Sequence, residues 1–180
     1  MWRSCSQGKL GRMVEMHLAA VRVELPTNTP ILLLQEAAGA RRTLPIYIGA
    51  AEATAIAYAL QGVPTARPMT HDLMRDLLTE LGATLDRVVI TELRESTFYA
   101  ELRLTLAGEA HTVSSRPSDA IALAVRLGTS IYADDELIDA EGVVLAPESG
   151  EDGAESPEAD ELVEQFSEFI KTIRPEDFSG

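Results

Sequence analysis

The feature that most constrains the fold of this chain is a helix, expected from residue 117 onward, that is apolar on every side. Residues 115–124 read SRPSDAIALA, in which a proline and then Asp119 suit the first turn of a helix. No side chain between residues 120 and 125 is polar, so this helix is predicted to be buried rather than amphipathic. Its entrance carries Arg116, Ser118 and Asp119. Polar groups at the edge of a core serve as caps, ion pairs or a site.

Length and charge place the chain among globular proteins with one substantial core. It has 180 residues, with 29 Asp and Glu against 15 Lys and Arg, and residues 148–180 hold 11 of the acids and 2 of the bases. An acidic chain is not expected to bind phosphate backbones strongly and without specificity, but a local site for a phosphodiester is compatible with it. The single cysteine, Cys5, permits no intramolecular disulfide. With no long apolar segment, we expect a cytoplasmic protein without membrane association.

Composition divides the chain into four parts. Residues 1–12 are polar and patternless and are predicted to be a disordered extension, and the folded domain is expected at 13–147. Residues 148–161 are acidic and rich in Gly, Ser and Pro, which predicts a flexible linker. Apolar residues then recur at helical spacing, so 162–178 is predicted to be an amphipathic C-terminal helix that docks on the domain or on a neighbouring subunit.

Periodicity predicts an α+β fold with a mixed, largely antiparallel sheet and three main helices. Each half of the domain has three strands followed by an Ala-rich helix, which suggests an internal duplication of a ββ(β)α unit. Two-residue links at 95–96 and 107–108 are expected to be hairpin turns. Strands are expected from residue 14 to a turn at 25–30, and at 31–34, 44–48, 86–92, 98–106, 109–114, 131–132 and 143–145; helices are expected at 50–61, 71–81 and from 117 to Gly128, with a helical turn at 134–139.

Two further helix starts carry polar residues. Residues 67–72 read RPMTHD, in which a proline-containing turn leads to His71 and Asp72, with Thr70 as the expected cap. Glu52 occupies the first turn of the helix at 50–61. The acids also have a structural interpretation, because a carboxylate there stabilises the helix dipole, and His71 can simply be solvated.

Acidic residues recur in the first turns of three expected helices, and this recurrence indicates a functional site. If the three helix starts lie together, the carboxylates of Glu52, Asp72 and Asp119 converge with His71, and Arg67 and Arg116 flank them. Such carboxylates can hold Mg²⁺ or Mn²⁺, and arginine binds phosphate through two hydrogen bonds. The alternative is an Arg–carboxylate network that only ties structural elements together. His17 and His111 fall in strands and are expected to be structural or solvated.

Several ordered motifs, from about residue 13 to 147, resemble the bifunctional nuclease domain family, also catalogued as domain of unknown function 151. They are PIYIG at 45–49, EA at 52–53, RPMTHDL at 67–73 and SRPSDAIALA at 115–124, and residues 173–178 also resemble the end of bacterial members. The resemblance implies nuclease activity on DNA and RNA and a small oligomeric α+β protein. It supplies no catalytic residues, so the site residues are inferred from polarity and position.

The sequence therefore predicts a cytoplasmic metal-dependent phosphodiesterase acting on nucleic acid, and a homo-oligomer, with a dimer favoured. Glu52, Asp72 and Asp119 are expected to hold Mg²⁺ or Mn²⁺ and, with His71, to activate water. Arg67, Arg116 and Ser118 are expected to bind the substrate. The alternative is a non-enzymatic binding or regulatory module in which the same motifs are structural.

Overall fold

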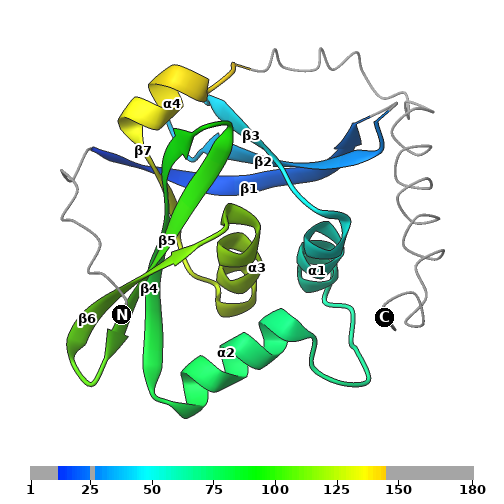
Figure 1. Ribbon diagram of the computed structural model, residues 1–180, viewed down its shortest axis with the longest axis vertical. Coiled ribbons are helices and arrows are strands. Elements are labelled where there is room, and N and C mark those ends of the chain that lie inside the picture. The colour runs from blue at the N-terminus through cyan, green and yellow to red at the C-terminus, as the bar shows by residue number, and fades with distance from the viewer. Residues whose placement is uncertain (1–11, 25–26, 145–180) are drawn as a thin grey trace. The chain divides into compact units, whose positions relative to one another are not determined.

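The computed structural model describes residues 12–24 and 27–144, and in them seven strands form one sheet, ordered β3-β2-β1-β7-β4-β5-β6 (Figure 1). Every neighbouring pair is antiparallel except β4 and β7, which are parallel. The predicted α+β class and mixed, largely antiparallel sheet are therefore confirmed. Residues 1–11, the predicted linker at 148–161 and the predicted C-terminal helix at 162–178 lie outside the described residues.

The sheet consists of two three-stranded meanders separated by the short strand β7. The strands are β1 Met13–Glu24, β2 Thr29–Glu36, β3 Thr43–Tyr47, β4 Ala83–Arg94, β5 Thr97–Leu106, β6 Glu109–Ser115 and β7 Ile131–Asp134; the helices are α1 Ala50–Gln61, α2 Thr70–Glu80, α3 Pro117–Leu127 and α4 Asp135–Glu141. One meander leads into α1 and the other into α3. This arrangement matches the predicted ββ(β)α units, while their origin by duplication stays a prediction.

Turn chemistry explains the tight links of the second meander. Residues 95 and 96 both have positive φ, as do 107 and 108, and two consecutive positive φ angles give the type I′ hairpin whose twist matches antiparallel strands. Arg94 pairs with Thr97, and Leu106 pairs with Glu109. Both predicted hairpin turns are confirmed.

Helices α1, α2 and α3 cover the same face of the sheet, and α1 and α3 lie side by side (Figure 1). Residues 120–124 of α3 are almost wholly inaccessible to solvent, as their lack of polar side chains predicted. Gly62 and Gly128 end α1 and α3 in the left-handed conformation, which glycine adopts without steric cost. Among the described helices, none has both the length and the apolar character needed to cross a membrane.

Helix α2 is amphipathic, but most of its leucines are not on its buried side. Its buried side is formed by His71 with the partly buried Met74 and Leu78. The leucines spaced four apart at 73, 77 and 81 are each more than half exposed. Tertiary polar contacts of the first turn, described below, fix which side of α2 faces the core, and helical spacing alone does not carry that information.

Two local predictions were wrong in detail, the cap of α2 and the strand at 143–145. Met69 rather than Thr70 precedes the first helical residue of α2, and neither Met69 nor Arg116 caps its helix through a side-chain hydrogen bond. The expected strand at 143–145 is reduced, in its described part, to a bridge between Val143 and Thr43. A short apolar segment that follows a helix can form hydrogen bonds with any free edge of a sheet. Here β3 is the edge strand that Val143 contacts.

A polar network away from the three helix starts ties β2 and β3 to α4. The side chain of Glu36 is only 3% exposed, and it accepts hydrogen bonds from the backbone N–H of Arg42 (2.8 Å) and from its Nε and Nη2 (3.1 and 2.6 Å). Arg42 also pairs with Asp135 and Asp139. Hydrogen bonds from Arg42 hold the pKa of Glu36 below its ordinary value despite burial. The network is a buried charge pair of the kind whose disruption is costly.

Candidate functional site

The three helices that cover the sheet each carry a carboxylate at their third residue. These acids are Glu52 in α1, Asp72 in α2 and Asp119 in α3. The first backbone N–H groups of a helix have no intrahelical acceptor and give this end a positive potential, so an acid in the first turn is stabilised. The local sequence thus explains why each acid is tolerated, and tertiary packing decides which of them come together.

Arg116 joins two of the three acids. Its Nε donates to Oδ2 of Asp119 at 2.7 Å and its Nη2 to Oδ1 at 3.1 Å. The same Nη2 lies 2.7 Å from Oε1 of Glu52. Nε2 of His71, from α2, lies 3.0 Å from Oδ1 of Asp119. We call these four residues, Glu52, His71, Arg116 and Asp119, the Arg116 cluster; the convergence of the starts of α1, α2 and α3 was correctly anticipated for them.

Exposure differs sharply within the Arg116 cluster. The Arg116 side chain is 66% exposed, whereas His71 is buried and Glu52 and Asp119 are mostly covered. Burial raises the pKa of Asp119, but hydrogen bonds from Arg116 and His71 outweigh it and hold that pKa below its ordinary value. Asp119 raises the pKa of Arg116 further. In the cluster, the solvent-exposed guanidinium of Arg116 therefore contacts the carboxylates of Glu52 and Asp119, and the buried imidazole of His71 contacts Asp119.

Gly49 lets Glu52 fold back over the start of α1. A Cβ atom added at Gly49 would lie 2.3 Å from Oε2 of Glu52, which is closer than carbon and oxygen can approach. The backbone of Gly49 has φ −75° and ψ 155°, which any residue can adopt. The need for glycine here is therefore a need for space beside the carboxylate.

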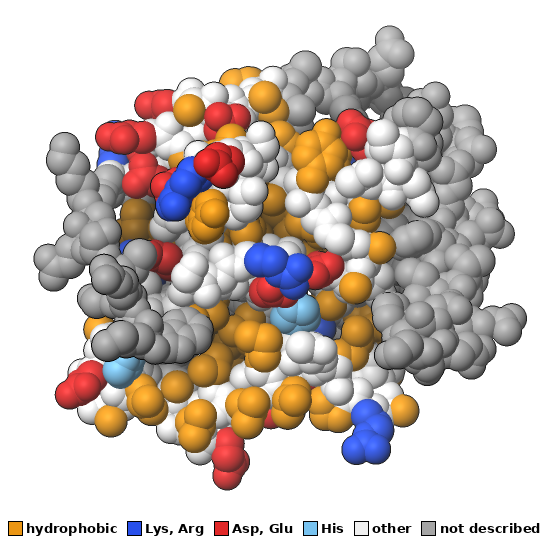
Figure 2. All heavy atoms as spheres, viewed as in Figure 1, with side chains coloured by type: hydrophobic (Ala, Val, Ile, Leu, Met, Phe, Trp, Pro, Cys, Tyr) orange, Lys and Arg blue, Asp and Glu red, His pale blue; other side chains and the backbone are white. Residues whose placement is uncertain are grey.

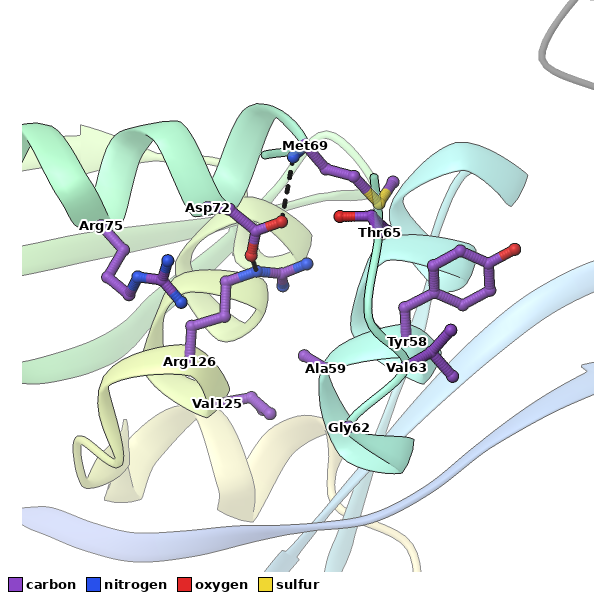
Figure 3. Close-up of a pocket in the computed structure, with 10 residues that line it drawn as sticks. All are labelled: Tyr58, Ala59, Gly62, Val63, Thr65, Met69, Asp72, Arg75, Val125 and Arg126. Atoms are coloured by element: carbon purple, nitrogen blue, oxygen red, sulfur yellow. Dashed lines mark hydrogen bonds and ion pairs between the residues drawn. The ribbon is translucent and has the colours of Figure 1, made fainter. Parts of the chain in front are cut away.

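Asp72 has other partners than the Arg116 cluster. Its Oδ1 accepts a hydrogen bond from Nε of Arg126 at 2.6 Å, and its Oδ2 accepts one from the backbone N–H of Met69 at 3.0 Å (Figure 3). Arg126 is 4% exposed and also donates to the carbonyls of Ala55 and Ala122 at 3.0 and 2.9 Å. Burial raises the pKa of Asp72, but Arg126 and the Met69 amide outweigh it and lower the pKa overall. Asp72 and Arg126 thus lock α2 to α1 and α3.

Arg126 is the residue of this region that sequence reasoning missed. It is the one charged side chain between residues 120 and 127, so it interrupts the apolar run that was the most informative feature of the chain. A buried arginine requires a carboxylate partner. That requirement was the available signal, although the sequence does not say which acid satisfies it.

The other two predicted substrate-binding residues, Arg67 and Ser118, lie outside the Arg116 cluster. Arg67 is exposed in the loop between α1 and α2, where it lines a depression together with Arg75. Ser118 is buried in the first turn of α3.

Each of the three predicted metal ligands is paired with an arginine in this structure. In the described part of the chain, no three His, Cys, Asp or Glu side chains are grouped so that they could hold a metal ion. Asp72 is bound by Arg126, and Glu52 and Asp119 share Arg116, so a guanidinium already provides positive charge between these two acids.

The Arg116 cluster has the parts needed for acid–base chemistry on an anion. An exposed arginine can bind a phosphate through two N–H groups. In the tautomer that carries its proton on Nε2 and donates it to Asp119, Nδ1 is the ring nitrogen of His71 that can accept a proton. The same contacts also satisfy one another and so would serve a purely structural network.

The sequence of the chain matches one known protein family over most of its described residues. A profile of the bifunctional nuclease domain matches residues 32–146. The chain belongs to the bifunctional nuclease domain family. The match spans β2 to α4 and includes every residue of the Arg116 cluster, so the resemblance seen in the sequence motifs is confirmed.

Relatives of this family member fall into two groups. An uncharacterized protein of Mycobacterium tuberculosis (strain H37Rv) is 45% identical over 168 residues, covering 93% of this chain and 99% of the relative. Bifunctional nuclease 2 of Oryza sativa subsp. japonica is 29% identical over 139 residues, and bifunctional nuclease 1 of Arabidopsis thaliana is 28% identical over 149. The chain spans less than half the length of these two plant proteins, 43% and 44%.

Proposed function

We propose that this protein hydrolyses phosphodiester bonds of DNA or RNA at the Arg116 cluster. The observation that carries the proposal is the exposed guanidinium of Arg116 held between Glu52 and Asp119, with Asp119 also holding the buried His71. Such a constellation joins an anion-binding group to an oriented imidazole. Membership of the bifunctional nuclease domain family and the plant relatives named bifunctional nucleases support this reaction class.

Each member of the cluster takes one part of the reaction. Arg116 exchanges its contact with Glu52 for two oxygens of the scissile phosphate. Asp119 keeps Nε2–H of His71 in place, and Nδ1 accepts a proton from the attacking water. The water oxygen forms a bond to phosphorus, and the bond to the leaving sugar oxygen breaks. That oxygen takes up a proton from solvent water, and His71 returns its proton to the solvent. Glu52, released from Arg116, orients the water.

The other predicted residues take supporting places in this proposal. Asp72 positions His71 by fixing the first turn of α2 through Met69 and Arg126. Arg67 and Ser118 stay predicted substrate contacts, although Ser118 is buried. The requirement for Mg²⁺ or Mn²⁺, with Glu52, Asp72 and Asp119 as ligands, stays a prediction, and no step above passes through a metal ion.

Cleavage by matched variants tests the proposal. His71→Gln and Asp119→Asn are compared with His111→Gln and Asp76→Asn, which change exposed residues of β6 and α2. Single-stranded DNA, duplex DNA and RNA are incubated with each protein in EDTA, Mg²⁺ or Mn²⁺, after thermal unfolding shows that the variant is folded. We expect the two site variants to lose about 10²–10⁴-fold in kcat, the range of acid–base catalysis. Equal cleavage by all five proteins would identify a contaminant and sink the assignment.

A non-enzymatic binding or regulatory module is the second candidate. Two observations favour it: the four groups of the cluster pair with one another, and the chain carries a formal charge of −14. In this case His71→Gln and Asp119→Asn lower the unfolding temperature without any substrate-dependent change. Stability and cleavage measured on the same samples therefore separate the two candidates.

We also propose that the protein forms a homodimer in the cytoplasm. Apolar side chains gather along α2 (Figure 2), where Leu73, Leu77 and Leu81 are exposed at intervals of four residues. Two copies of this stripe can pack antiparallel around a twofold axis. Light scattering should give twice the mass of one chain, and Leu77→Lys should give a folded monomer.

A further inference from the structure

A cavity separate from the Arg116 cluster lies where α1 ends and α2 begins. It has a volume of about 310 Å³ and is bounded by α1, the loop after it, the first turns of α2 and the end of α3 (Figure 3). Binding sites of this size are at the small end of ligand pockets. The cavity therefore suits one small planar or compact group rather than a large ligand.

The two walls of the cavity differ in chemistry. Tyr58, Val63 and Val125 contribute apolar surface, and Thr65 a hydroxyl group, whereas Arg75 and the buried pair of Asp72 and Arg126 form the polar wall (Figure 3). Simple anions do not need an apolar wall. A nucleobase presents both an apolar face and hydrogen-bonding edges, and bases stack on aromatic side chains in proteins that bind single strands.

The charge on the polar wall suits the acceptor atoms of a base. Arg126 donates to Asp72, Ala55 and Ala122, so its charge is already compensated within the protein. Arg75 instead pairs with the neighbouring Asp76, at 2.8 Å, in an exposed ion pair. Exposed pairs contribute little and exchange partners readily, so the Arg75 guanidinium can turn to a ring nitrogen, a carbonyl oxygen or the adjoining phosphate.

A short stretch of nucleic acid can cover the distance between the cavity and the Arg116 cluster. Glu52 of the cluster and Ala59 of the cavity wall are seven residues apart on α1, which puts them on the same side of the helix and about 10 Å apart along its axis. A strand rises about 3.4 Å per nucleotide when stacked, so three nucleotides or fewer cover this distance. On α2, His71 faces the cluster and its neighbour Asp72 lines the cavity.

We propose that this cavity binds one nucleobase of the strand being cut, an inference that rests on the proposed nuclease activity. The base packs between Val125 on one side and Tyr58 with Val63 on the other (Figure 3), and Arg75 contacts its polar edge or the phosphate next to it. The cavity would hold the strand so that a phosphate a few nucleotides away reaches Arg116. It would thereby favour single strands, because a base enters a cavity only when it is unpaired.

Nucleotide binding measured without cleavage tests this inference. The protein with Asp119→Asn, which keeps the cavity residues unchanged, is titrated with AMP, GMP, CMP and UMP, and with ribose 5-phosphate and inorganic phosphate. Amide NMR shifts at residues 58–63, 65 and 125–126 report binding. We expect at least one nucleotide to bind about tenfold more tightly than ribose 5-phosphate, as one base stacked on an aromatic ring provides.

Variants that fill the cavity give the matched controls. Ala59→Leu places a larger side chain in the cavity wall, and Ala51→Leu makes the same change at an exposed position of the same helix. Nucleotide binding should be lost in the first and kept in the second. If Ala59→Leu does not fold, Val63→Leu narrows the cavity from the exposed loop without adding an aromatic ring, with the same expected loss.

The outcomes separate this inference from the nuclease itself. Nucleotide binding that disappears when the cavity is filled supports the cavity even if no cleavage is found, in which case the proposed function alone fails. Cleavage by the wild-type chain with no nucleotide binding at the cavity overturns the inference and leaves the nuclease standing. Equal binding of ribose 5-phosphate or inorganic phosphate also overturns it, because the site would then recognise an anion and not a base.

Discussion

The ion pair between Asp72 and Arg126 gives the most discriminating test of how this site is built. Sequence reasoning placed Asp72 among the metal ligands and catalytic groups, whereas its carboxylate lies on a buried arginine. Asp72→Asn keeps the shape of the side chain, removes its charge, and replaces one of its two acceptor oxygens with an NH2 donor. A catalytic Asp72 predicts lost activity in a stable protein, and a positioning Asp72 predicts lost stability.

The expected magnitude follows from burial. Arg126 is 4% exposed and Asp72 is 19% exposed, so Asp72→Asn leaves a charged guanidinium inside the protein without a carboxylate partner, with two backbone carbonyls and an amide as its neutral partners. Removing one partner of a buried pair costs about 3–5 kcal/mol. Because Asp72 retains some contact with water, we expect about 3 kcal/mol of lost unfolding free energy. Replacing both residues, with Asp72→Asn and Arg126→Met, should cost less than the sum of the single changes.

Urea unfolding of the wild type, the two single variants, the double variant and Asp76→Asn measures these energies. Asp76→Asn is the control, because it removes an exposed acid of the same helix and should change stability by about 1 kcal/mol or less. The pKa of Asp72 is lowered in the folded state, so its contribution is complete above the unfolded value of about 3.9 and fades as pH falls through the folded value. Wild type and Asp72→Asn should therefore converge in acid. A loss no larger than that of Asp76→Asn at pH 7 would refute the reasoning.

Three further predictions address separate parts of the fold. Gly49→Ala should displace the Glu52 carboxylate, whose Oε2 would lie 2.3 Å from the new Cβ, and should lower cleavage as Glu52→Gln does, with about 1 kcal/mol or less lost in urea unfolding; wild-type kinetics would contradict this. Glu36→Gln should cost about 3 kcal/mol, since Glu36 is buried against Arg42, and a loss under about 1 kcal/mol in the same assay would argue against a buried charge there. Gly128→Ala should cost about 1 kcal/mol, because the residue has φ +65°, and an unchanged unfolding temperature would show that the helix end rearranges.

Local patterns explain why most elements could be predicted. The apolar run of residues 120–124, the glycines at 62 and 128, and the two hairpin links act over a few residues, and all were placed correctly. The Arg116 cluster was foreseen in part because its acids repeat at helix starts. Its contacts between α1, α2 and α3 then follow from the packing of those helices on one face.

Long-range partners could not be predicted in the same way. Asp72 finds Arg126 at a separation of 54 residues, and nothing in the spacing distinguishes that partner from Arg67 or Arg116. The side of α2 that faces the core could not be predicted for the same reason, since it depends on the long-range polar contacts of His71 and Asp72. The place of β7 between two meanders also depends on pairing that is far apart in sequence.

That central place of β7 has a consequence for how the protein is made. In the sheet, β7 alone hydrogen-bonds to both β1 and β4, yet among the described strands it is the last to be synthesised. While the chain emerges from the ribosome, the first meander and then the second can form, but their shared sheet closes only after residue 134 has been translated. Until then β1 and β4 each present an unpaired edge, so nascent chains stalled before β7 are expected to recruit chaperones or to associate through those edges.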